Sequence, residues 1–141
     1  MNKKKEFEAI LSIKEKGNLS EFHSYLEGFL GKFVKQNHYI DNYIGDYPSF
    51  IEPVFLGNNV EIGDDVLLGP NVFIGDNCKI GDFNELSNSI ILDNVVLGSL
   101  FKLKNCIVVS NTLLNIENLS IENCILSGVA NSKEELDIKY Y

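Results

Sequence analysis

The chain has 141 residues, with 20 acidic and 12 basic side chains and a formal net charge of -8 at pH 7. This length fits one domain with a small appendage, and the acidic balance argues against nucleic acid or an anionic membrane as a partner. The sequence has no apolar stretch long enough to span a membrane and no signal-peptide core at its start, so we expect a cytoplasmic protein.

Residues 1–43 are expected to form an N-terminal helical segment and a connector. A first charged helix would end at Gly17 and Asn18, and a second would begin at Ser20, whose hydroxyl suits an N-cap, and run to about residue 36. The second helix carries an apolar stripe at helical spacing, formed by Phe22, Leu26, Phe29, Leu30 and Phe33. Two interpretations stay open: the stripe packs across the end or flank of the following domain, or it docks on a partner chain.

Residues 44–130 repeat every six positions. Each repeat begins with an apolar residue, at Ile44, Phe50, Leu56, Ile62, Leu68, Ile74, Ile80, Leu86 and Leu92, and the fourth residue after it is also mostly apolar. Three repeats make an eighteen-residue coil, which predicts a mainly β fold, a parallel β-helix of about five coils. Glycine, asparagine and aspartate follow the first residue, and we expect them at corners because they tolerate positive φ.

The inward columns can be followed through the less regular repeats. Val54, Val72, Ile90, Ile107 and Ile125 step by 18, 18, 17 and 18 residues, which places one missing residue near positions 95–97. A second column contains Phe50, Leu68, Leu86, Leu103 and Ile121. Apolar residues are also expected to point outward, at Phe55, Leu67, Phe73, Ile91 and Val108, and they favour self-association unless something covers them.

The cysteines and aspartates have structural explanations. Cys78 falls at an inward position, and Cys106 and Cys124 would stack on neighbouring coils, where a disulfide is geometrically conceivable but disfavoured in a reducing cytosol. Asparagines at positions 88, 105 and 123 are expected to form one column. Turn chemistry explains the corner aspartates, which are Asp64, Asp65, Asp76, Asp82 and Asp93. No metal site is predicted, and residues 131–141 form a C-terminal cap or tail.

The repeats resemble the hexapeptide-repeat superfamily of left-handed β-helices. The resemblance is nearest to the C-terminal domains of sugar-1-phosphate nucleotidyltransferases, on the run VFLGNNVEIGDDVLLGPNVFIGDNCKIGD, the following NSIILDN and the helix placed before the first coil. It implies left-handed winding and a homo-oligomer, with a trimer as the expected form.

The acetyltransferases of that group use a histidine as general base, and Ser99 takes its place here. The only histidines, His23 and His38, lie outside the repeats, which excludes the three-histidine metal site of γ-type carbonic anhydrases. No phosphate-binding loop of a nucleotidyltransferase catalytic domain is recognised. We therefore expect a non-catalytic module without cofactor, acting in oligomerisation or in docking to a catalytic nucleotidyltransferase partner.

Two alternatives remain. The first is an acyltransferase that acts on a sugar nucleotide with an acyl-CoA such as acetyl-CoA, with Ser99, Lys102, Lys104 and Asn105 as candidate site residues. Either lysine would need a lowered pKa to act as a base. The second is a module that binds a sugar nucleotide without turnover.

Overall fold

The computed structural model describes residues 43–140 together with Ser24 and Gly28. The predicted first helix, the apolar stripe and both histidines lie outside the described residues. Ser24 and Gly28 have helical backbone and are exposed. These two positions do not by themselves confirm the N-terminal helical segment.

From residue 43 the chain consists of short strands and one 3₁₀ turn. The strands are β1 (Tyr43–Ile44), β2 (Ser49–Phe50), β3 (Val54–Leu56), β4 (Glu61–Ile62), β5 (Leu67–Leu68), β6 (Val72–Ile74), β7 (Lys79–Ile80), β8 (Glu85–Ser87), β9 (Ser89–Ile91), β10 (Val96–Leu97), β11 (Phe101–Val108), β12 (Leu113–Leu114), β13 (Leu119–Ser127), β14 (Val129–Ala130) and β15 (Asp137–Tyr140). The 3₁₀ turn η1 is Lys133–Glu135.

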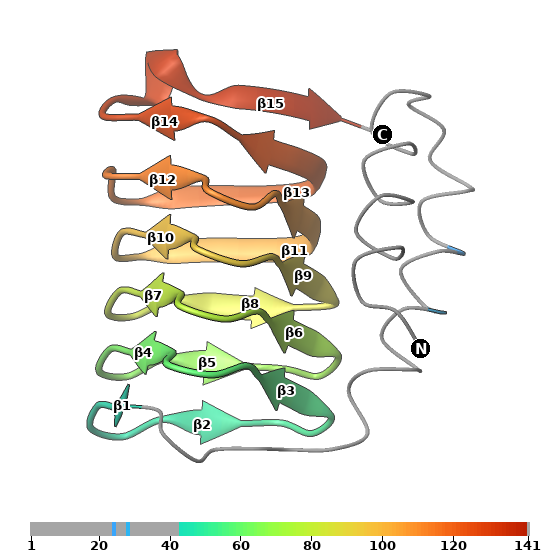
Figure 1. Cartoon of the computed structure of the whole chain (residues 1–141), viewed down its shortest axis with the longest axis vertical. Helices are drawn as coiled ribbons and strands as arrows, with labels where there is room; N and C mark the ends of the chain where they lie inside the picture. The colour runs from blue at the N-terminus through green and yellow to red at the C-terminus, as the bar shows by residue number, and fades with distance from the viewer. Residues whose placement is uncertain (1–23, 25–27, 29–42, 141) are drawn as a thin grey trace.

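The strands stack into a parallel solenoid with three faces (Figure 1). Face 1 contains β1, β4, β7, β10, β12 and β14. Face 2 contains β2, β5, β8 and the first halves of β11 and β13, whereas face 3 contains β3, β6, β9 and the second halves of β11 and β13. The predicted parallel solenoid of about five turns is confirmed.

The core fills the interior of the coils because alternate residues of each strand point inward. On face 3, Val54 and Leu56 belong to the core cluster, so Phe55 between them points outward. The predicted inward column from Phe50 through Leu68, Leu86 and Leu103 to Ile121 is confirmed by strand pairing in that order.

The other predicted column is wrong after its second member. Val72 pairs with Ser89, and Phe73 pairs with Ile90, so the residue is missing at the corner of residues 87–89 and not near 95–97. Ser89 therefore points inward, where its hydroxyl donates to the Ser87 carbonyl at 2.7 Å and accepts from the Cys106 amide at 3.2 Å. Ile91 belongs to the core cluster and Ile90 does not.

The same shift corrects the list of outward residues. Val108 lies in the core cluster, whereas Ile107 and Ile125 pair with the outward Ile90 column. The sequence could not reveal this, because residues 90–92 are all aliphatic and the repeat alone does not show which of them faces inward.

Each corner is held by bonds between successive coils. Most positive φ angles belong to the third residue after the repeat start, as in Asn59 and Asn77. Among the corner glycines, Gly69 has a φ of 107°, whereas Gly57 has no positive φ. Glycine is needed at position 57 because a Cβ there would collide with the carboxylate of Asp76, which accepts the Asn58 amide at 2.8 Å. The prediction that the corner glycines supply positive φ is therefore wrong for this position.

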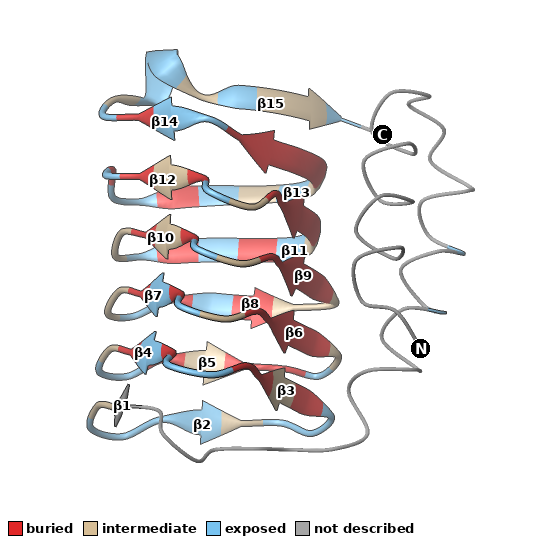
Figure 2. Cartoon of the chain, in the orientation of Figure 1, coloured by how far each residue is buried: buried red, intermediate tan, exposed pale blue. Residues whose placement is uncertain are grey.

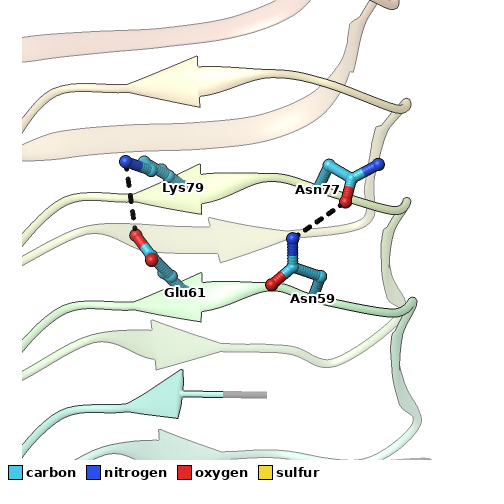
Figure 3. Close-up of polar contacts among 4 residues, drawn as sticks. All are labelled: Asn59, Glu61, Asn77 and Lys79. Atoms are coloured by element: carbon cyan, nitrogen blue, oxygen red, sulfur yellow. Dashed lines mark hydrogen bonds and ion pairs between the residues drawn. The ribbon is translucent and has the colours of Figure 1, made fainter. Parts of the chain in front are cut away.

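Side-chain ladders continue the same stacking. The Asn59 side chain donates a hydrogen bond to that of Asn77 on the next coil at 3.0 Å. Beside it on face 1, Glu61 and Lys79 form an ion pair of 3.6 Å (Figure 3). In the predicted asparagine column, Asn105 bonds Asn123 at 3.2 Å.

The tail folds back as β15 and pairs antiparallel with the second half of β13, with Leu126 opposite Ile138. It extends the sheet of face 3 at the last coil.

Candidate functional site

The candidate lysines lie on the outer side of face 2. Phe101 and Leu103 point into the core, so Lys102 and Lys104 project outward from the same strand. Both line an open hollow of about 440 Å³ that reaches Tyr140 of β15. The other lining residues are Ser120, Ile121 and Glu122.

Charges on this face alternate in sign from strand to strand. Lys102 pairs with Glu85 on the preceding coil at 3.7 Å, and Lys104 lies in register with Glu122 on the following coil. Both members of the Lys102–Glu85 pair are more than half exposed, at 71% and 51%. Exposed ion pairs of this kind contribute little to the stability of the fold. Because both signs of charge are present, the surface of the hollow is neither uniformly basic nor uniformly acidic.

Ser99 and Asn105 do not line this hollow. Ser99 lies at the corner between faces 1 and 2, and its carbonyl accepts the Asn118 amide at 3.1 Å. Asn105 lies at the opposite corner, where its side chain belongs to the asparagine ladder. The intervening strand separates Ser99 from Lys104 by about 16 Å at the usual rise per residue, whereas Asn105 directly follows Lys104.

The cysteines and aspartates act within the coils. Burial, followed by the charges of Asp93 and Asp76, raises the pKa of the Cys78 thiol from 9.0 to about 12. Cys106 and Cys124 are free thiols with their sulfur atoms 3.5 Å apart, and the hydrogen bond between them and then burial raise the pKa of Cys124. Within residues 43–140, Ser24 and Gly28, no group of three metal-ligating side chains is present.

The expected turn role of the aspartates is confirmed for all five. Asp64, Asp76, Asp82 and Asp93 each accept a backbone amide of the preceding coil at 2.8 Å. Asp65 occupies a positive-φ corner position.

The sequence analysis overlooked an exposed apolar pair at the corner between faces 1 and 2, which we call the corner ridge: Phe83 and Leu100. These residues stack on successive coils, are 53% and 47% exposed, and have φ angles of 59° and 61°. The same corner column holds Asp65 one coil before and Asn118 one coil after.

A signal for the ridge was present in the sequence. Asparagine and aspartate tolerate the left-handed region, whereas a bulky apolar residue there is an outlier. Phe and Leu stand at corner positions that elsewhere hold Asn or Asp, apart from Tyr47 in the first coil, which has a φ of 57°. These large residues at corner positions are the feature that could have identified the ridge.

The outer side of face 1 changes from charged to apolar along the solenoid. Its outward column begins with Glu61 and Lys79 and continues with Val96, Leu113 and Val129. Val96 and Leu113 are half-buried and Val129 is 56% exposed. The ridge thus borders a further apolar strip. Among the described residues no helix is long and apolar enough to cross a membrane.

Comparison with known proteins supports the resemblance drawn from the repeats. The family model described as GMPPB C-terminal domain matches residues 50–140. A solved structure of a hexapeptide-repeat-containing acetyltransferase from Vibrio cholerae aligns over 94% of this chain and 90% of that chain, with 14% identity and a TM-score of 0.30. Nothing further rests on a likeness this distant. A comparison with the curated protein sequences finds no match.

Proposed function

Because the chain belongs to the GMPPB C-terminal domain family, whose model matches residues 50–140 of its 141, we propose that it is a non-catalytic module that assembles with other protein chains. The family is that of a sugar-1-phosphate nucleotidyltransferase C-terminal domain, as the repeats and the NSIILDN segment predicted. The partners we propose are copies of the chain itself and a catalytic nucleotidyltransferase.

The corner ridge is the observation that carries this proposal. Phe83 and Leu100 hold a backbone conformation that costs a bulky side chain about 1–2 kcal/mol, and they place large apolar surfaces in water. Neither feature benefits the isolated solenoid, and strained or exposed apolar residues of this kind are typical of interaction sites.

The surface around the ridge supports the same role. Val96, Leu113 and Val129 extend the apolar area from the corner onto the last coils of face 1. A flat strand face beside an apolar corner suits packing against an equivalent solenoid. With the left-handed winding that the resemblance implies, we propose a cyclic homo-oligomer, and a trimer as its form.

An acyltransferase is the weaker candidate. Lys102 and Lys104 share a hollow, but Ser99 lies at a corner away from both, so the described residues do not assemble a nucleophile or acceptor site beside a base. A test with acetyl-CoA still separates the two functions. Binding would raise the melting temperature, because a ligand that binds only the folded state stabilises it.

The experiment is light scattering of the purified chain, compared with the double variant Phe83→Asn, Leu100→Asn. We expect the wild type to be oligomeric and the variant to dissociate while remaining folded, because asparagine suits the left-handed backbone at both positions. The matched control is Asp65→Asn, in the same column one coil away, which should leave the mass unchanged.

Two outcomes would contradict the proposal. One is a monomeric wild type that also fails to capture a nucleotidyltransferase. The other is a stabilising shift with acetyl-CoA together with acetyl transfer to a UDP- or dTDP-sugar, which would favour the acyltransferase.

A further inference from the structure

The outer side of face 3 is apolar from β3 to the second half of β13, and only the added strand β15 places a charged residue, Lys139, beside this column. Its outward column consists of Phe55, Phe73, Ile90, Ile107 and Ile125. The rings of Phe55 and Phe73 stack with centroids 4.9 Å apart and planes 3° from parallel. The equivalent columns of faces 1 and 2 carry charged residues such as Lys79 and Lys102.

From Phe73 onward this column is also fully buried, which outward residues of the other faces are not, and Phe55 at its start is half-buried. Phe73, Ile90, Ile107 and Ile125 are 0% exposed, whereas the outward Leu67 of face 2 and Leu113 of face 1 remain half-exposed. Figure 2 shows β6 and β9 buried throughout, in contrast to β4 and β7, which each carry an exposed residue.

Edge-to-edge pairing cannot produce this difference, because strands on all three faces have such neighbours. Within residues 43–140, the strands next to face 3 join it at their edges and do not cross it. The burial is a property of the single chain, so a second copy is not needed to account for it.

We propose that residues 20–36 of the same chain form an amphipathic helix that lies along face 3 and covers this column with the stripe Phe22, Leu26, Phe29, Leu30 and Phe33. This inference does not depend on the proposed function.

The lengths match. Phe22 and Phe33 are eleven positions apart, or about 16 Å along a helix. The outward column covers four coil-to-coil steps, or about 19 Å at the usual strand spacing.

The two described positions of this segment also fit. In a helix with 3.6 residues per turn, Ser24 falls about 175° and Gly28 about 145° from the centre of the stripe. Both are exposed, and a Cβ added to Gly28 would meet no atom within 4 Å. The side opposite the stripe therefore faces open space.

Photo-crosslinking tests the placement directly. Phe29 is replaced by the photoreactive p-benzoylphenylalanine in the full chain, and a 1:1 mixture of unlabelled and ¹⁵N-labelled protein is irradiated. We expect links to the strands of face 3, with both linked peptides carrying the same isotope. The control replaces Ser24 instead, and it should give no link to face 3.

Two results would overturn the inference. Peptides of mixed isotope would mean that a second copy covers the column. Links to face 1, to face 2 or only to the edge of the first coil would mean that the segment lies elsewhere.

Stability measurements give an independent readout. Leu26→Asp should lower the melting temperature by about 5 °C or more and increase binding of an apolar dye, because it would separate the stripe from the column. Ser24→Asp should change the melting temperature by about 1 °C or less, and Gly28→Ala should raise it, because alanine favours a helix without meeting a neighbour. Equal effects of Leu26→Asp and Ser24→Asp would contradict docking.

Discussion

Two sets of outward apolar residues on this solenoid have opposite surroundings. Ile107 of the face 3 column is 0% exposed, whereas Leu100 of the corner ridge is 47% exposed. Both point away from the core, and both come from repeats of the same type. An outward apolar residue on a β-solenoid is therefore not by itself a sign of self-association.

The backbone separates the two sets as well as burial does. Ile107 lies within β11 and is paired on both sides, while Leu100 occupies a corner with φ of 61°. A covered strand residue stabilises the chain that contains it. An exposed residue in a disfavoured conformation costs stability, so its benefit has to arise in contact with another molecule.

The largest expected effect follows from truncating a residue of each set. Ile107→Ala should destabilise the chain by about 2–4 kcal/mol, because it removes buried methyl groups and leaves a cavity. Leu100→Ala should change the stability of the dissociated chain by no more than about 0.5 kcal/mol. Urea unfolding at low protein concentration measures both, and similar losses would remove the distinction between the sets.

A second prediction concerns the pH dependence of stability that arises from Cys78, which is completely buried on the inner side of the coils. The folded chain holds the pKa of Cys78 at about 12, above its ordinary value of 9.0, because burial disfavours the thiolate. The unfolded state then loses this proton first, so the contribution of Cys78 to stability is fully present below pH 9 and decreases as the pH rises toward 12. The slope should be about 1.4 kcal/mol per pH unit.

Unfolding by urea between pH 8 and 10.5 measures this dependence. Cys78→Ala is the control. It should remove the pH dependence that this thiol gives to the free energy of unfolding, although it lowers that free energy at every pH. A slope that Cys78→Ala leaves unchanged would show that another group titrates.

The fold was predictable because its determinants repeat. Apolar residues every six positions and one face column from Phe50 to Ile121 predict the coils without any tertiary information. The prediction lost its register at Ser89, where a polar residue takes an inward position by bonding Ser87 and Cys106. Three successive aliphatic residues then offered no alternation from which to recover it.

The site was less predictable for two physical reasons. Strand alternation places Lys102 and Lys104 on one face, whereas Ser99 and Asn105 lie at corners and do not line the hollow. Tyr140 reaches the hollow only because β15 folds back on β13. This pairing lies outside the repeats, so the repeats do not predict it.

A smaller effect is expected from relieving the ridge. Leu100→Asn should stabilise the dissociated chain by about 0.5–1 kcal/mol, since asparagine tolerates the left-handed conformation that Leu100 holds. The same change should weaken association. Asn118→Leu, in the next coil of the column, provides the reverse experiment and should destabilise by a similar amount. A loss of stability for Leu100→Asn would mean that Leu100 makes favourable contacts within its own chain.

The smallest effect is expected on face 2. Lys102→Ala removes an exposed ion pair with Glu85, which should alter stability by less than about 0.5 kcal/mol. Its oligomeric mass should equal that of the wild type, because the ridge lies at the corner and Lys102 lies on the face. If Lys102→Ala dissociated the oligomer as Phe83→Asn, Leu100→Asn is expected to do, the charged face would have to contact the partner. The contrast between an exposed ridge that contacts the partner and a covered column would then no longer hold.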